Sequence, residues 1–144
     1  MSAEVFDWMI GLTFDKVVED GRTMKLTASI LGQPFVVEFL HYQDCCEDVS
    51  IEEVHGDLQD LVGSPIVQAE CVSEHNNDEG SSSTWTFYKF ATNKGSVVVR
   101  WLGSSNGYYS ESVDMQINGL DYCDPKEILK EIRDKAILDI AGIE

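Results

Sequence analysis

The segment HYQDCCED, residues 41–48, holds the side chains of this sequence that are best suited to chemistry. Two adjacent cysteines, Cys45 and Cys46, stand between Asp44 and Glu47, and His41 lies four residues before the first cysteine. Thiolate, imidazole and carboxylate groups all bind zinc, and a thiol beside an imidazole can act as a nucleophile. The sequence therefore offers four interpretations of this segment: a metal site, a redox pair, a nucleophile or a simple turn.

The spacing of the cysteines argues against a metal site. Structural zinc sites use cysteines with residues between them, so that both sulfurs turn toward one ion, whereas adjacent residues in a strand point to opposite faces. In the turn interpretation Asp44 caps a short turn and Glu47 reaches back to it as the third residue, which leaves one cysteine buried and the other near the surface. We favour the turn, and we expect no bound metal and no cofactor.

A catalytic cysteine is also disfavoured in this segment. Asp44, Glu47 and Asp48 surround the cysteines with negative charge, and negative charge disfavours the thiolate form on which nucleophilic attack depends. A disulfide between adjacent residues would need a distorted peptide, and we expect the four cysteines of a chain without a visible signal peptide to stay reduced. We therefore favour a binding protein over an enzyme.

Charge is the strongest feature of the composition. The chain of 144 residues has 10 lysines and arginines against 26 aspartates and glutamates, which gives a formal net charge of -16. No lysine or arginine occurs between Leu26 and Tyr88, although twelve acidic residues lie in that span. Such a surface attracts basic partners and repels phosphates. Direct binding to nucleic acid or to an anionic membrane is therefore not expected, and a basic protein is the expected partner.

Most of the chain shows the pattern of β-strands. Apolar residues recur with period two or in short β-branched runs, with glycine, proline and asparagine between the runs. The segment 75–83 has no apolar residue, so we expect a mobile surface loop there. A short helical turn is expected around Leu58 and Leu61. The expected strands cover residues 12–20, 23–30, 35–42, 49–56, 65–74, 84–92, 96–102 and 108–117.

The period changes after Asp124 and predicts an amphipathic helix over residues 124–142. Asp124 is a good N-cap, Pro125 suits the first helical position, and Glu127 is acidic in the first turn. The apolar stripe of this helix must cover either the sheet of its own chain or a second copy, so a homo-oligomer could form through it. The fold class is therefore α+β: one domain with a mainly antiparallel β body of about seven or eight strands, residues 1–123, and one C-terminal helix.

Two segments carry the candidate contacts for a partner. The first is the acidic segment from Glu38 to Glu79, which would steer a basic partner toward the protein. The second is the turn SNGYY, residues 105–109, where at least one of the two tyrosines must point outward. The candidate binding residues are Asp44, Glu47, Asp48, Glu52, Glu53, Asn106, Tyr108 and Tyr109.

Three segments together resemble a family of small, functionally uncharacterised proteins of bacteriophages and prophages. They are HYQDCCED at 41–48, EEVHGDLQDLVGSPI at 52–66 and TWTFYKFATNKGSVVVRWLGSSNGYYSESV at 84–113. The resemblance implies an accessory phage protein in the cytoplasm of the host bacterium. By analogy with other small acidic phage proteins, it also implies inhibition of a host defence or nucleic-acid-processing protein, through an acidic surface that mimics DNA.

Two other functions stay open on the sequence alone. A protein that sequesters a nucleotide signal would need a pocket lined with arginine, for which Arg22, Arg100 and Arg133 are the candidates. A metal-supported enzyme would use the Asp-Cys-Cys-Glu segment. The leading expectation is a non-enzymatic protein that binds a basic partner through its acidic segment.

Overall fold

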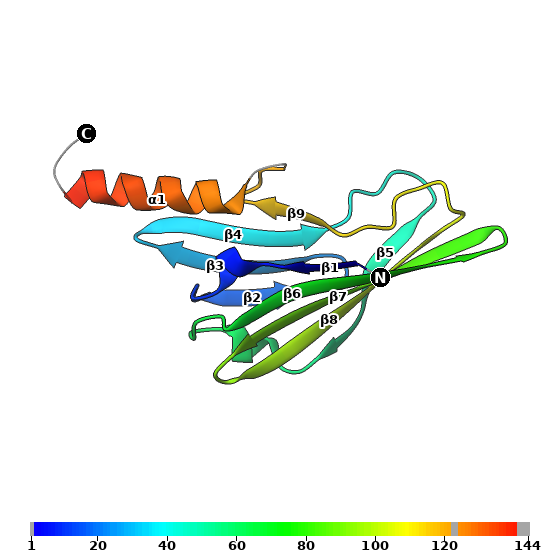
Figure 1. Cartoon of the computed structure of the whole chain (residues 1–144), viewed down its shortest axis with the longest axis horizontal. Coiled ribbons are helices and arrows are strands. Elements are labelled where there is room, and N and C mark those ends of the chain that lie inside the picture. Colours follow the sequence, from blue (N-terminus) through cyan, green and yellow to red (C-terminus); the bar gives the residue numbers. More distant parts are fainter. Residues whose placement is uncertain (1, 122–123, 141–144) are drawn as a thin grey trace.

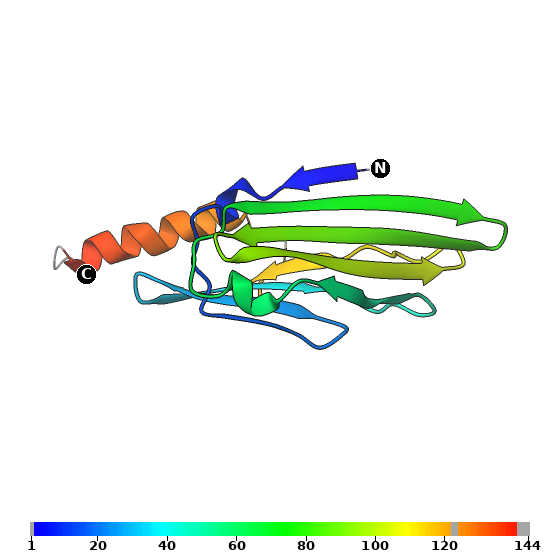
Figure 2. The same ribbon diagram turned by 90° about the horizontal axis from the view of Figure 1, so that it is seen from below.

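The structure of the protein, a computed structural model, describes residues 2–121 and 124–140. In this part of the chain nine strands form two antiparallel sheets, followed by one α-helix (Figure 1). The two sheets lie one above the other as the layers of a sandwich (Figure 2). The expected fold class is confirmed. No helix among the described residues is long and apolar enough to span a membrane.

The larger sheet has five strands in the order β1-β6-β7-β8-β5. Its long central strands pair by tight turns, as the alternating patterns of 84–92 and 96–102 predict. Its strands are β1 (Ser2–Val5), β5 (Asp48–His55), β6 (Gln68–Asp78), β7 (Ser81–Thr92) and β8 (Gly95–Ser105).

The smaller sheet has four strands in the order β2-β3-β4-β9. Its first three strands form the meander that the period-two runs predict. Its strands are β2 (Lys16–Glu19), β3 (Met24–Ile30), β4 (Gln33–Leu40) and β9 (Asp114–Ile117), and two short 3-10 helices, Asp7–Met9 and Leu58–Leu61, lie in the connections.

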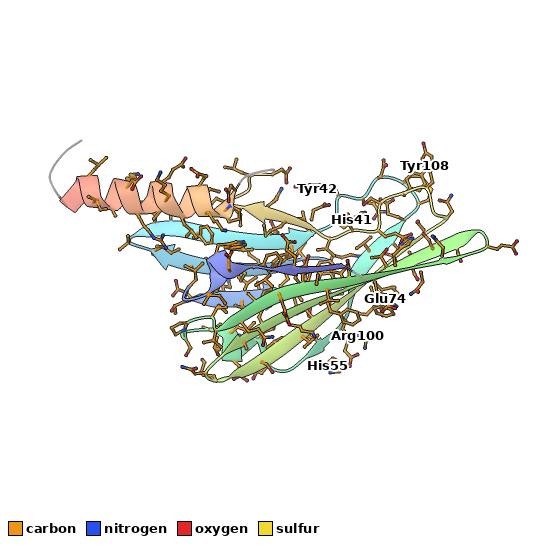
Figure 3. The ribbon with its side chains drawn as sticks, in the orientation of Figure 1. His41, Tyr42, His55, Glu74, Arg100 and Tyr108 are labelled. Carbon is orange, nitrogen blue, oxygen red and sulfur yellow. A yellow bond between two sulfur atoms is a disulfide. The ribbon has the colours of Figure 1, made fainter. Side chains whose placement is uncertain are left out.

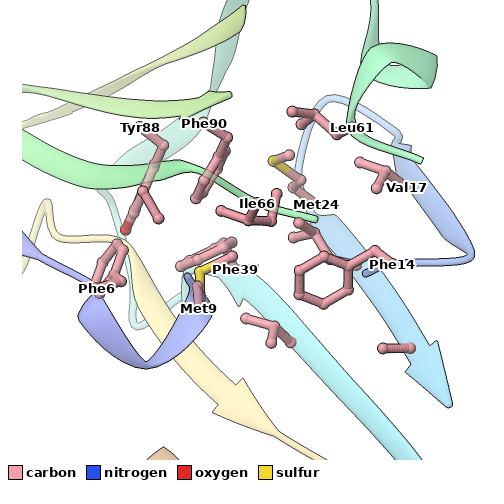
Figure 4. Close-up of a cluster of buried hydrophobic side chains, with 14 of the residues drawn as sticks. Phe6, Met9, Phe14, Val17, Met24, Phe39, Leu61, Ile66, Tyr88 and Phe90 are labelled. Carbon is pink, nitrogen blue, oxygen red and sulfur yellow. The ribbon is translucent and has the colours of Figure 1, made fainter. Parts of the chain in front are cut away.

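The hydrophobic core fills the space between the two sheets. Inward-facing side chains of β7 and β8, among them Tyr88, Phe90 and Trp101, meet those of β3 and β4. The ring centroids of Phe39 and Tyr88 are 4.4 Å apart, and Phe6 joins them from the segment after β1 (Figure 4). Burial of this apolar surface is the main source of the stability of the sandwich.

The helix α1 (Pro125–Ile140) begins where the sequence predicts. The Asp124 carboxylate accepts a hydrogen bond of 3.0 Å from the Lys126 N–H, which confirms Asp124 as the N-cap. Leu129, Ile132 and Ala136 are buried, so the apolar stripe docks on the body of its own chain beside β4 (Figure 1). Ile137 on the same stripe stays 63% exposed. The predicted end of the helix at residue 142 lies outside the described residues.

Three expectations about the strands are wrong. The segment 75–83 is no loop, because β6 and β7 continue through it to a tight turn, with Asp78 opposite Ser81. The expected strand 108–117 shrinks to Asp114–Ile117, and the serine- and glycine-rich segment before it is irregular. The first strand, β1, was not expected, and it raises the number of strands to nine because it pairs with β6.

Candidate functional site

The segments 41–47 and 106–113 meet at one end of the sandwich, where β4 and β8 end. A hollow of about 680 Å³ lies there, and His41 and Tyr42 from the first segment line it together with Ser110, Val113 and Met115 from the second segment and β9. The carboxylates of Asp44, Glu47, Asp114 and Asp121 also line it. We call this the acidic hollow. Its ten described lining residues include no lysine or arginine.

Glu47 holds the first segment in place from the inside. Its carboxylate accepts hydrogen bonds from the backbone N–H groups of Asp44 and Cys45, at 2.9 and 2.8 Å, and from the Nε2 of His41 at 2.9 Å. The contact from Glu47 to the Asp44 N–H is the one that the turn interpretation predicts. Gln43 adds hydrogen bonds to the carboxylate and to the backbone carbonyl of Glu47.

The burial of Glu47 corrects its expected role. Its side chain is 0% exposed and that of His41 is 3% exposed, so Glu47 cannot be a contact residue for a partner. Burial by itself raises the pKa of Glu47, but the hydrogen bonds from Cys45, His41 and Asp44 outweigh it and lower this pKa from 4.5 to about 2. Glu47 is therefore a buried anion that fixes the turn.

His41 links the two segments. Its Nδ1 lies 2.7 Å from the backbone carbonyl oxygen of Ser112, and its Nε2 faces Glu47. Both ring nitrogens thus lie within hydrogen-bonding distance of an oxygen atom. His41 therefore bridges the buried carboxylate of Glu47 and, through Ser112, the second segment.

A second buried carboxylate, Glu111, holds the other segment. It accepts hydrogen bonds from the hydroxyls of Ser82, Ser105 and Thr84, and His75 Nδ1 lies 3.6 Å away. Burial raises the pKa of Glu111, yet the hydroxyls and the nearby His75 lower it by more, so the net shift is downward. Sequence reasoning missed Glu111. The sequence signal was Gly103, because a glycine inside a strand often marks the close approach of another backbone. A Cβ at Gly103 would lie 2.4 Å from the backbone oxygen of Glu111 and 2.8 Å from its Cβ.

The two cysteines depart from expectation. The structure brings the sulfur atoms of Cys45 and Cys46 together, and both residues are exposed, so the expectation of one buried cysteine is wrong. The expectation of reduced thiols stays a prediction. The interior of the turn is occupied by the buried Glu47 side chain and not by a cysteine. Burial raises the pKa of Cys71 to about 11, which makes it a poor nucleophile, and Cys123 lies outside the described residues.

The other acidic candidates, Asp48, Glu52 and Glu53, lie outside the acidic hollow. Asp48 is exposed and pairs with Arg22 at 2.6 Å. Glu52 and Glu53 lie farther along β5, where Glu53 pairs with Arg100 at 2.6 Å and with His55 at 3.0 Å.

The tyrosine turn lies at the same end of the molecule as His41 (Figure 3). The Asn106 carboxamide accepts a hydrogen bond of 3.0 Å from the Tyr108 N–H and so shapes the turn. Tyr108 is 83% exposed and packs edge-on against Tyr109. As the sequence predicts, at least one of the two tyrosines points outward.

Eight of the ten lining residues of the acidic hollow were not among the predicted binding residues. Three of these eight form its polar wall: Tyr42, Asp114 and Asp121. The Tyr42 hydroxyl donates to the Asp121 carboxylate at 2.8 Å, and this hydrogen bond raises the pKa of Tyr42. Asp114 enters the hollow because β9 pairs with β4, opposite Leu40. These contacts join residues more than seventy positions apart, and period-two patterns carry no signal for such pairings.

The alternative sites receive little geometric support. Among residues 2–121 and 124–140, no group of three or more histidine, cysteine, aspartate or glutamate side chains is arranged to hold a metal ion. Arg22 lines a hollow of about 490 Å³, but Asp48 and Glu47 line it as well. Arg100 lies on the opposite face of the larger sheet from the core, and Arg133 lies on α1.

Comparison with known families identifies the family of the chain. A family model described as a domain of unknown function, DUF7448, matches residues 12–115. No curated protein and no solved structure matches the chain. The chain belongs to the DUF7448 family, and its helix α1 lies outside the matched region.

Proposed function

For this member of the DUF7448 family, we propose a non-enzymatic function: the acidic hollow binds a basic partner protein. The observation that carries the proposal is the hollow of about 680 Å³ lined by four carboxylates and by no described lysine or arginine. In a chain of net charge -16, such a concave site concentrates negative potential and steers a positively charged partner toward it.

The four carboxylates differ in exposure, and this difference supports the proposal. Glu47 is buried and already holds its hydrogen-bond donors, whereas Asp44 and Asp121 are exposed and Asp114 is partly exposed. The rim therefore offers three carboxylates to lysine or arginine side chains. Tyr108, exposed at the same end, supplies a large apolar contact of the type that dominates many interfaces.

The resemblance of the sequence to phage proteins suggests the class of partner. We propose that the basic partner is a host defence or nucleic-acid-processing protein, and that the acidic hollow occupies the surface with which this protein would bind nucleic acid. A DNA-binding surface is rich in lysine and arginine, so it is complementary in charge to the rim.

Two variants that have the same net charge as each other, but lose their charges at different places, test the proposal. The hollow variant replaces Asp44, Asp114 and Asp121 with asparagine, and the helix variant replaces Glu127, Glu131 and Asp134 with their amides; each loses three negative charges. Tagged wild-type protein and both variants would be used to capture proteins from bacterial lysate, with mass spectrometry as the readout. We expect a basic protein that wild type and the helix variant retain and the hollow variant loses. Equal retention by all three would contradict the proposal.

A further inference from the structure

The outward face of the larger sheet is unusually apolar at its centre. Side chains that alternate with the buried Tyr88 and Phe90 must point away from the core, and antiparallel sheets usually place polar residues there. Here six neighbouring positions of β6, β7 and β8 form what we call the aromatic face: Val72, Trp85, Phe87, Val98, Arg100 and Leu102.

The strand register makes the aromatic face continuous. Val72, Phe87 and Arg100 lie opposite one another across three strands, and Trp85 lies opposite Leu102 in the next row. All six residues are partly exposed. The helix α1 lies beside β4 of the other sheet and leaves the aromatic face open (Figure 1). A contiguous apolar patch on a sheet surface marks an interaction site.

Arg100 lies over the aromatic rings and is hydrogen-bonded to Glu53. Its guanidinium carbon lies 4.9 Å from the centre of the Trp85 ring and 5.8 Å from that of Phe87. Its Nη1 donates to Glu53 at 2.6 Å. Tryptophan and arginine are the residues most often found at the energetic centre of interfaces, and side chains that are already fixed lose little entropy on binding.

The mixed charges around the aromatic face suit a second copy of this chain as the occupant. Copies with a net charge of -16 repel each other over most of their surface. The aromatic face differs, because Arg100 and the adjoining Lys89 lie between the acidic residues Glu53, Glu70 and Glu74 on neighbouring strands. Both signs of charge around an apolar centre make the surface complementary to itself, which a two-fold interface requires.

We propose that two copies of the protein associate through the aromatic face, with their larger sheets packed face to face. Glu74 and Arg100 lie on this sheet, away from the labelled Tyr42 and Tyr108 (Figure 3). The dimer therefore leaves both acidic hollows free, and the inference does not depend on the function proposed for them.

Sedimentation velocity of the full chain across the micromolar range tests the association. We expect wild type to form a dimer, and Leu102→Glu to raise its dissociation constant at least tenfold, because the new carboxylates would be desolvated at an apolar centre. Ile137→Glu on α1 is the matched control, since Ile137 is 63% exposed and lies outside the aromatic face. A monomer at every concentration would overturn the proposal, as would a dimer that Ile137→Glu dissociates and Leu102→Glu leaves intact.

A second measurement on the unaltered chain does not depend on the folding of a variant. The acetylation rate of Lys89 is compared with that of Lys94, which lies in the exposed turn between β7 and β8. We expect rising protein concentration to slow labelling at Lys89 relative to Lys94. An unchanged ratio of the two rates would contradict the aromatic face as the interface.

Discussion

Buried and exposed carboxylates lie side by side at the loop end of the sandwich, and the comparison separates two uses of acidic charge. Glu47 and Glu111 point inward, where backbone N–H groups, hydroxyls and a histidine satisfy them. Asp44 and Asp121 are exposed and line the acidic hollow. Residue type alone does not distinguish the two groups, but burial and partners do. The buried pair holds the segments in place, and the exposed residues are the ones available to a partner.

The largest effect is expected from Glu47→Ala. This change leaves two backbone N–H groups and the buried His41 ring without their acceptor, and unpaired buried groups are costly. We expect a larger fall in melting temperature than for Glu111→Ala or Asp124→Ala. Asp44→Ala, three residues away and exposed, is the control and should melt close to wild type. Equal melting temperatures for the two variants would contradict the claim that the buried carboxylate, and not the exposed one, stabilises this segment.

Glu111→Ala should have a smaller effect. The hydroxyls of Ser82, Ser105 and Thr84 lose their shared acceptor, but neutral hydroxyls can rotate toward other partners. We expect the free energy of unfolding to fall by about 1–3 kcal/mol, measured by urea denaturation. A loss as large as that of Glu47→Ala would mean that the second segment depends on its carboxylate as strongly as the first.

The pH dependence of stability provides an independent check on the buried group. The pKa of Glu47 is lowered on folding from 4.5 to about 2, so the unfolded chain binds the proton more tightly than the folded chain. The stability that this carboxylate contributes is complete above pH 4.5 and is lost as the pH falls toward about 2. We expect urea midpoints of wild type to decline over this window and those of Glu47→Gln to decline less. Parallel curves would show that another group causes the acid sensitivity.

Asp124 sharpens the comparison, because it is an exposed carboxylate with a structural task. It accepts the Lys126 N–H at the start of α1, and Asp124→Ala should lower the free energy of unfolding by about 0.5–2 kcal/mol through loss of the N-cap. Asp124→Asn, which keeps the acceptor, is the control and should cost less. Equal losses for both changes would assign the effect to charge.

The sequence predicts the parts of this fold that depend on local patterns. The hairpin of β7 and β8 follows from alternation, although its turn is Asn93 and Lys94 alone and the expected third loop residue, Gly95, begins β8. The start of α1 follows from Asp124 and Pro125. Prediction failed where strands lack an apolar signal. The tips of β6 and β7 pair through backbone hydrogen bonds, and their polar side chains resemble those of a loop.

The candidate site was only partly predictable for a related reason. HYQDCCED and the tyrosine turn do lie at one end of the molecule, and Glu47 does reach back to the Asp44 N–H. Its burial was not predicted, because carboxylates are usually exposed and its partner His41 is fixed by Ser112, 71 residues away. Asp114 and Asp121 enter the acidic hollow through strand pairing and chain return, which one sequence does not reveal.

The most direct test of the central claim is the affinity of the captured basic partner for wild type and for the two charge-matched variants over a range of salt concentrations. The Debye length shrinks from about 8 Å at physiological ionic strength to about 3 Å at 1 M salt, so binding through exposed carboxylates must weaken steeply as salt is added. The account predicts a steep salt dependence for wild type and the helix variant, with weaker and flatter binding for the hollow variant. Identical affinities and salt slopes for all three proteins would contradict it.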